Sequence, residues 1–252
     1  MIRVLLPVPI LAALLVASPL HGQASKYQFK VDERYSLSWW QVSPHLNHLW
    51  ANTCPGEPSW QPGDERSSGW SYDGKKAPKS YHANTIDTIH VPLYPRPVAT
   101  PICPSAVSGT ITASDSNSWS GVSGRLDIKA DAFVTGLDMR DRYATRAVLQ
   151  ASSYPTIGFR IDSLVNVVPG DTVRATAVGV FELRGARVPK RVPVMAWREA
   201  GGLRVTGQFR IYAIDLVEIY KMSRVVLGLG VGTGIWRYVH LGFDVVLRSD
   251  GS

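Results

Sequence analysis

Histidine, cysteine and tryptophan side chains gather in one part of this 252-residue chain, before residue 104. Two histidines three residues apart can share a metal ion on one helical turn, and a cysteine thiolate can join them. The chain has neither a C-x-x-C nor an H-E-x-x-H sequence, and a proline precedes the closest histidine pair. The sequence therefore predicts no metal site, and a metal-dependent or redox accessory protein remains the alternative. The candidate residues are His45, His48, His82, His90, Cys54 and Cys103.

The two cysteines, Cys54 and Cys103, are explained more simply by a disulfide bond. A single pair of cysteines in an oxidising compartment usually forms one. This pair would close a loop of about 50 residues, which contributes about 4 kcal/mol to the free energy of unfolding in the chain-entropy model. Prolines, glycines and tryptophans interrupt any regular pattern between the cysteines. Residues 43–104 are therefore expected to form an irregular insertion that the disulfide staples.

Sequence motifs of the common enzyme classes are missing from this chain. Residues 121–125 read Gly-Val-Ser-Gly-Arg, which lacks the last glycine of the G-x-S-x-G nucleophile elbow. The glycine-rich residues 228–234 do not match G-x-G-x-x-G, and no helix-forming run follows them. Neither a Walker loop nor the C-x-x-C-H haem attachment sequence occurs. The sequence thus predicts a protein that is not an enzyme and uses no cofactor.

A short helix is expected from residue 138 to residue 151. Asp138 is expected to be its N-cap, and Asp141 places a second carboxylate in the first turn, where the helix dipole favours it. Arg140 stands between these two acids and could suggest catalysis. A capped helix with a salt bridge is the commoner arrangement, so a structural role is predicted for all three residues.

The first 24 residues have the pattern of a secretory signal peptide. Arg3 carries a positive charge, residues 4–17 are apolar apart from two prolines, and Gly22 and Ala24 supply the small residues of a cleavage site. The apolar run is too short to span a bilayer, which takes about 20 residues. Residues 1–24 are therefore expected to be a signal peptide, and residues 25–252 a single domain exported to the periplasm or the extracellular space.

The formal net charge of the chain is +7, and its basic residues are scattered. The tightest cluster, in residues 184–191, holds four basic residues in eight positions, which is sparser than a typical duplex-binding stripe. Nucleic acid is therefore not an expected partner. A weak association with anionic membrane surfaces is compatible with this charge, and the oligomeric state is left open.

Polar and apolar residues alternate over much of the chain after residue 104. Such alternation predicts strands with one buried and one solvated face. Turn residues separate several of the runs, so neighbouring strands are expected to form antiparallel hairpins. Many strands with one apolar face indicate an all-β barrel or sandwich. The clearest alternating runs are residues 125–132, 173–177, 203–211 and 239–247.

Several of these stretches, taken in order, resemble a known family: the YceI-like, lipocalin-like proteins described as polyisoprenoid-binding. The resemblance covers residues 27–42 and 107–247. The chain departs from the family in having Tyr35 where a histidine is usual, in the insertion between the cysteines, and in a short glycine-rich loop. The stretches that carry the resemblance are residues 27–32, Tyr35-Ser36, Thr135-Gly136, residues 139–141, 154–159, 179–185 with Val188, Pro189 and Val192, residues 205–211, and 239–247.

The resemblance implies an extended antiparallel barrel of about eight strands, with one short helix, around a long apolar pocket that holds an isoprenoid or another lipid. The inward-facing candidates mix large and small side chains, so alternation alone is compatible with a cavity or with a solid core. A solid barrel that acts through its surface is therefore a second alternative, and the resemblance favours the cavity. The expected lining residues are Phe133, Phe159, Ile161, Phe181, Leu183, Phe209, Ile211 and Phe243.

Overall fold

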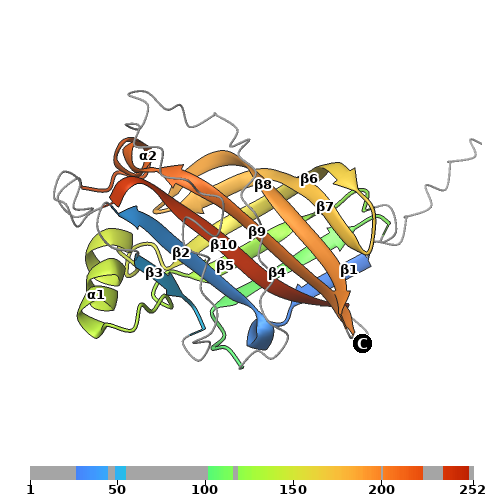
Figure 1. Ribbon diagram of the computed structural model, residues 1–252, viewed down its shortest axis with the longest axis horizontal. Coiled ribbons are helices and arrows are strands. Elements are labelled where there is room, and N and C mark those ends of the chain that lie inside the picture. Colours follow the sequence, from blue (N-terminus) through green and yellow to red (C-terminus); the bar gives the residue numbers. More distant parts are fainter. Residues whose placement is uncertain are drawn as a thin grey trace, which may run out of the picture.

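The alternating segments form antiparallel strands that curl into a barrel (Figure 1). The computed structural model describes residues 27–44, 49–54, 102–115, 119–199, 201–223 and 235–249. Within these ranges lie ten strands of one sheet and four short helical segments. The strands are β1 (Tyr27–Val31), β2 (Leu37–Pro44), β3 (Leu49–Asn52), β4 (Val107–Ala113), β5 (Ser123–Lys129), β6 (Thr156–Val168), β7 (Thr172–Leu183), β8 (Ala186–Glu199), β9 (Gly202–Tyr212) and β10 (Ile235–Ser249). The helical segments are η1 (Glu33–Tyr35), α1 (Asp138–Tyr143), η2 (Ala144–Leu149) and α2 (Ala213–Glu218).

Strand β10 closes the barrel because it pairs with three other strands. It pairs with β9 over most of its length, with β2 over its first half, and with β1 at its end, where Val31 lies opposite Leu247. The ring therefore consists of β1 and β4–β10, with the β2–β3 hairpin added at β10. This closed eight-strand barrel confirms the predicted all-β fold and its strand number.

The sequence of the turn between β7 and β8 explains why these two strands form a tight hairpin. Only Arg184 and Gly185 separate the two strands, and both have positive φ, at 49° and 75°. Positive φ at both central residues is the geometry of a type I′ turn, whose twist matches that of the strands it joins. Glycine accepts this conformation without a steric penalty, which explains the glycine at the second position.

Helix α1 begins at Asp138, but Asp138 is not its N-cap as predicted. Leu137 occupies the N-cap position and makes no capping hydrogen bond with its side chain. The carboxylate of Asp141 instead holds the residue before the turn, because its Oδ1 accepts from the backbone N–H of Thr135 at 2.9 Å and from its hydroxyl. Gly136 has a φ of 83°, and this reversal of the chain lets Thr135 face back to Asp141. The helix continues as the wider turn η2 and ends at Gln150, before Ser152 as expected.

The predicted disulfide between Cys54 and Cys103 is confirmed, with its Cα atoms 4.8 Å apart. Both cysteines are buried and pack with Leu37 and Trp39 of β2 into a small apolar cluster. Trp39 crosses Gly242 of β10, where a Cβ would lie 2.3 Å from the indole ring. Glycine at this position therefore lets the cluster sit directly on the sheet.

Regular structure extends further into the predicted insertion than the alternation indicated, because residues 49–52 form β3. Asn52 at the end of β3 also exchanges backbone hydrogen bonds with Val134, at 3.2 and 2.9 Å, just before α1. The predicted signal peptide, residues 55–101 and the glycine-rich residues 228–234 lie outside the described residues. None of the helices in the described ranges has the length and apolar character needed to cross a bilayer.

On the outer face of the sheet, a buried ion pair ties β9 to β10. Arg204 donates to both carboxylate oxygens of Asp244, at 2.8 and 2.7 Å, and a third bond of 3.2 Å reaches Glu199. Burial disfavours the charged guanidinium, but these hydrogen bonds outweigh the burial and raise the pKa of Arg204. Removing one partner of such a pair leaves an uncompensated buried charge, which is strongly destabilising.

We expect the disulfide to be the main covalent source of stability. Replacing both Cys54 and Cys103 with serine should lower the free energy of unfolding by about 4 kcal/mol, because the unfolded chain gains the freedom of an open loop. Urea denaturation of the oxidised wild type and of the double variant measures the difference. The wild type in reducing agent is the control and should behave like the variant; equal stability of oxidised and reduced protein would contradict the prediction.

We also expect Asp141 rather than Asp138 to hold the start of α1. Asp141→Ala removes both bonds to Thr135 and should destabilise the helix by about 1 kcal/mol, the usual net contribution of a hydrogen bond. Amide hydrogen exchange in α1 should accelerate about fivefold, because local opening becomes easier. Asp138→Ala is the matched control and should leave exchange nearly unchanged. Faster exchange in Asp138→Ala than in Asp141→Ala would contradict this prediction and support Asp138 as the N-cap.

Candidate ligand-binding cavity

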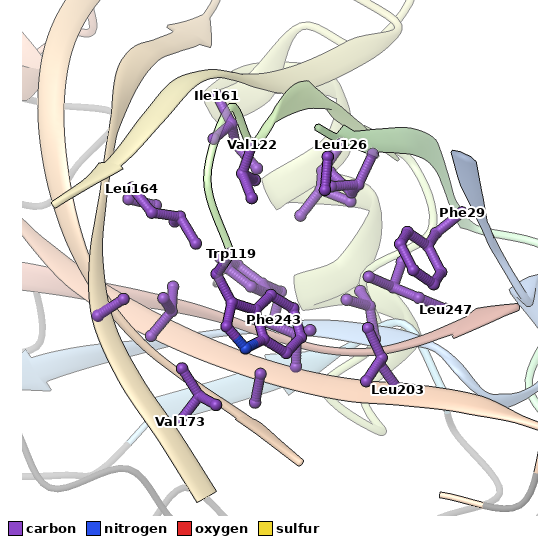
Figure 2. A pocket seen from close by; sticks show the side chains of 18 residues that line it. Phe29, Trp119, Val122, Leu126, Ile161, Leu164, Val173, Leu203, Phe243 and Leu247 are labelled. Carbon is purple, nitrogen blue, oxygen red and sulfur yellow. The ribbon is translucent and has the colours of Figure 1, made fainter. Parts of the chain in front are cut away.

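One half of the barrel interior contains an apolar cavity, and we call it the hollow half. The cavity has a volume of about 60 Å3, measured as the space open to the centre of a water-sized sphere, and Figure 2 shows the side chains that point into it. Every lining side chain is aliphatic or aromatic. The lining residues are Phe29, Ile111, Ala113, Trp119, Val122, Leu126, Ile161, Leu164, Val173, Ala175, Ala177, Val194, Ala196, Leu203, Val205, Phe243, Val245 and Leu247.

The hollow half is lined by small residues on the wall formed by β7 and β8. Ala175 faces Val194 across the two strands, and Val173 faces Ala196. An eight-stranded barrel has an interior that ordinary side chains can just fill, so short side chains on one wall leave space. The cavity therefore follows from the placement of alanine and valine along these strands.

A second pocket adjoins the cavity and has a polar lining. It shares Phe29 and Leu203 with the cavity, and Arg198, Glu199 and Ser249 also line it, so we interpret it as the mouth of the cavity. These residues come from the end of β8, the start of β9 and the end of β10. An apolar interior joined to a polar entrance fits a molecule with an apolar chain and a polar end.

The other half of the barrel, beneath α2, is solidly packed. The rings of Phe181 and Phe209 meet edge to face with centroids 4.9 Å apart, and Tyr220 packs on Phe181 at 6.3 Å. Six of the eight residues predicted to contact a ligand lie in the core outside the cavity lining, and only Ile161 and Phe243 line it. The six are Phe133, Phe159, Phe181, Leu183, Phe209 and Ile211. Their contact with a ligand stays a prediction.

Phe243 marks the boundary between the two halves. It lies opposite Gly207 on β9, and a Cβ at Gly207 would be 2.4 Å from the end of the phenyl ring. The ring therefore occupies the space that a side chain at position 207 would need. Val205 lines the cavity on one side of this layer, whereas Phe209 packs in the solid half on the other. Phe243 and Gly207 together form the floor of the cavity.

Polar groups are buried in the solid half. Lys190 on β8 lies opposite Gly179 and is buried, with its ammonium 6.0 Å from the centre of the Phe209 ring. Within the described part of the chain, neither Oδ1 of Asp215 nor the hydroxyl of Tyr220 has a hydrogen-bond partner. Burial raises the pKa of Asp215 to about 6; Lys190 opposes this shift and Glu218 adds to it. Burial, and then the carboxylate of Asp215, raise the pKa of Tyr220.

Metal chemistry finds no support in the described ranges, where no three His, Cys, Asp or Glu side chains come together as a metal site requires. The candidate histidines His45, His48, His82 and His90 lie outside these ranges. His240 is buried beside Arg210; burial first, and then the arginine charge, hold its pKa well below the usual value.

The closed ring with an apolar internal cavity and a polar mouth defines a lipocalin-like barrel, a class that holds small ligands inside. Residues 104–245, more than half of the chain, match the YceI-like domain. The chain therefore belongs to the YceI-like family, which confirms the resemblance drawn from the sequence.

Solved structures agree with this fold. The chain is similar to BcnA from Burkholderia cenocepacia, with 15% identity and a TM-score of 0.50, covering 86% of this chain and 98% of that one. It is also similar to a polyisoprenoid binding domain from Saccharophagus degradans implicated in plant cell wall breakdown, with 11% identity and a TM-score of 0.54, covering 88% and 98%. A comparison with curated proteins finds no match.

The buried carboxyl of Asp215 should make stability depend on pH. Its folded pKa of about 6 lies above the ordinary aspartate value of 3.8, so the folded protein binds the proton more tightly. The resulting stabilisation is present at low pH and is lost as the pH rises through about 6, by up to about 3 kcal/mol. Asp215→Asn cannot lose this proton, so its stability relative to wild type should rise between about pH 4 and pH 8. Urea denaturation across that range measures it, and parallel curves would contradict the assignment.

Proposed function

We propose that this protein is an exported lipid-binding protein that holds an isoprenoid or a similar apolar chain inside its barrel. The observation that carries the proposal is the cavity lined entirely by aliphatic and aromatic side chains. A polar ligand group inside it would lose its hydrogen bonds to water without replacement, which costs several kcal/mol. An apolar chain has no hydrogen bonds to water to lose on entry, so it is the class of ligand that suits this interior.

The apolar lining of the cavity also supports a lipid tail as the part of the ligand that enters it. Burial contributes about 25 cal/mol for each Å2 of apolar surface removed from water, so the tail supplies most of the affinity. The polar end of the ligand then stays at the mouth, where Arg198, Glu199 and Ser249 lie.

The family and one structural neighbour support the isoprenoid class of ligand. The chain belongs to the YceI-like family, and the similar domain from Saccharophagus degradans is described as polyisoprenoid-binding. A branched isoprenoid chain suits a wall of alternating alanine and valine, because its methyl groups fill the spaces above the short side chains. We therefore favour an isoprenoid over a straight acyl chain.

Export is part of the proposal. Residues 1–24 have the charge and apolar pattern of a signal peptide. The disulfide between Cys54 and Cys103 points to the same environment, because such bonds persist mainly in oxidising compartments. An apolar chain cannot diffuse freely in water, so a carrier is most useful in an aqueous compartment beside a membrane.

Lipid extraction of the purified protein tests this function directly. Native mass spectrometry should show an added apolar mass, and solvent extraction followed by lipid mass spectrometry should identify it. The same extraction of a disulfide-containing protein without a cavity, purified in parallel, is the control for adventitious lipid. Protein from its native host that carries no lipid would contradict the proposal.

A matched pair of tryptophan variants should locate the ligand. Ala175→Trp fills the cavity, so it should expel the lipid while the unliganded barrel still folds. Thr176→Trp, at the next position on the outer face of β7, is the control and should retain lipid. Retained lipid per protein, measured after purification, separates the two variants. Equal retention in both would exclude this cavity as the site.

A variant in the solid half completes the comparison. Phe181→Ala removes a ring that packs on Phe209 and Tyr220, so it should lower the free energy of unfolding by about 3–5 kcal/mol. Lipid retention by the fraction that stays folded should be unchanged, because Phe181 does not line the cavity. Loss of lipid with little loss of stability would instead extend the binding site into this half.

A further inference from the structure

Helix α1 and its continuation η2 project from the barrel, and none of their residues is buried (Figure 1). Isolated helices of this length are marginal in water, so they usually depend on packing. Here the segment is held by the bonds from Thr135 to Asp141 and by partial burial of Val148 and Leu149 against the core. Much of its outer surface is therefore exposed to solvent.

The outer surface of this helix has an unusual composition. Met139, Arg142 and Tyr143 are exposed and lie at i, i+3 and i+4 on one side of α1, and Arg146, which is also exposed, follows on the wider turn η2. Met139 is 70% exposed and Tyr143 49%. Leu137, 47% exposed, comes just before the helix. The solvent-facing stripe of a helix is normally polar, whereas this one combines large apolar side chains with arginines.

We propose that this α1 stripe (Leu137, Met139, Arg142, Tyr143 and Arg146) docks the protein on the surface of an anionic lipid bilayer. Apolar side chains enter the boundary between headgroups and acyl chains, where the amphipathic ring of tyrosine is also favoured. Arginines beside them are attracted to the anionic headgroups.

The acidic residues of the helix do not cancel this attraction. The carboxylate of Asp141 is turned inward to Thr135. Asp138 is exposed one turn before Arg142 and offsets part of its charge. Because Arg142 and Arg146 outnumber this one acid, the exposed surface keeps a net positive charge. A convex helix with this charge suits a bilayer surface better than the groove of another protein.

The docking surface and the cavity mouth lie at opposite ends of the barrel. The segment that contains α1 leads into the start of β6 at Thr156. The mouth lies near Val168, at the opposite end of the same strand. A strand of this length separates the ends by about 40 Å. Docking through α1 thus holds the mouth away from that bilayer, and it is independent of whether the cavity contains a lipid.

The test is sedimentation of the purified protein with vesicles of equal parts phosphatidylethanolamine and phosphatidylglycerol, and with phosphatidylcholine vesicles as reference. The protein should bind the anionic vesicles, bind the neutral ones much less, and dissociate as salt is added. Arg142→Gln and Arg146→Gln should each reduce the partition constant about fivefold. Met139→Ser should reduce it severalfold.

Two variants at the opposite end serve as matched controls. Arg174→Gln and Val168→Ser change an exposed arginine and an exposed apolar residue near the mouth, and both should leave vesicle binding unchanged. Absence of binding by the wild type, or equal losses in the control variants, would overturn the proposal. Melting temperature and lipid retention should not change in any stripe variant, because none of these side chains is buried or lines the cavity.

Discussion

Closure of the sheet through β10 is the constraint on which the rest of this barrel depends. One strand bonds to β9, β2 and β1, so the ring leaves no free edge between β1 and β9. In a closed ring, every second side chain points inward. The inward side chains stack in layers along the barrel axis, and the position of a residue along its strand decides which layer it belongs to. The same alternation puts the buried Arg204–Asp244 pair on the outside, where it ties two strands without entering the cavity.

Side-chain volume then decides which layers are filled. Phenylalanine and tyrosine rings gather beneath α2, whereas alanine and valine line β7 and β8 toward the mouth. An empty apolar cavity lowers stability, because its lining loses packing contacts. The solid half and the disulfide compensate for this loss without obstructing the cavity. An apolar chain bound there, as proposed, would restore the missing contacts and thereby couple binding to stability in the hollow half.

Alternation in the sequence was sufficient to predict an antiparallel all-β fold and parts of β5, β7, β9 and β10, whereas β3 lies in a stretch that was expected to be irregular. Alternation could not show which inward-facing residues belong to the solid half and which to the hollow half. Phe181 and Ala175 have the same parity on β7, yet they lie about 20 Å apart, in different halves. The layer depends on the register with β6, which shifts after Ile161 and is not visible in the pattern. The contact between Thr135 and Asp141 at the start of α1 was not predicted for a similar reason, because it depends on the reversal of the chain at Gly136.

The two halves of the barrel also differ in the polar side chains they contain. This difference would favour one orientation of a bound ligand. In the solid half, Lys190, Asp215 and Tyr220 are fixed in the fold, beyond the floor that Phe243 provides. The hollow half offers no hydrogen-bonding side chain except the indole N–H of Trp119. A ligand that entered polar end first would bury that end largely without partners, at a cost of several kcal/mol. The reverse orientation buries only the apolar chain and leaves the polar end in contact with water at the mouth.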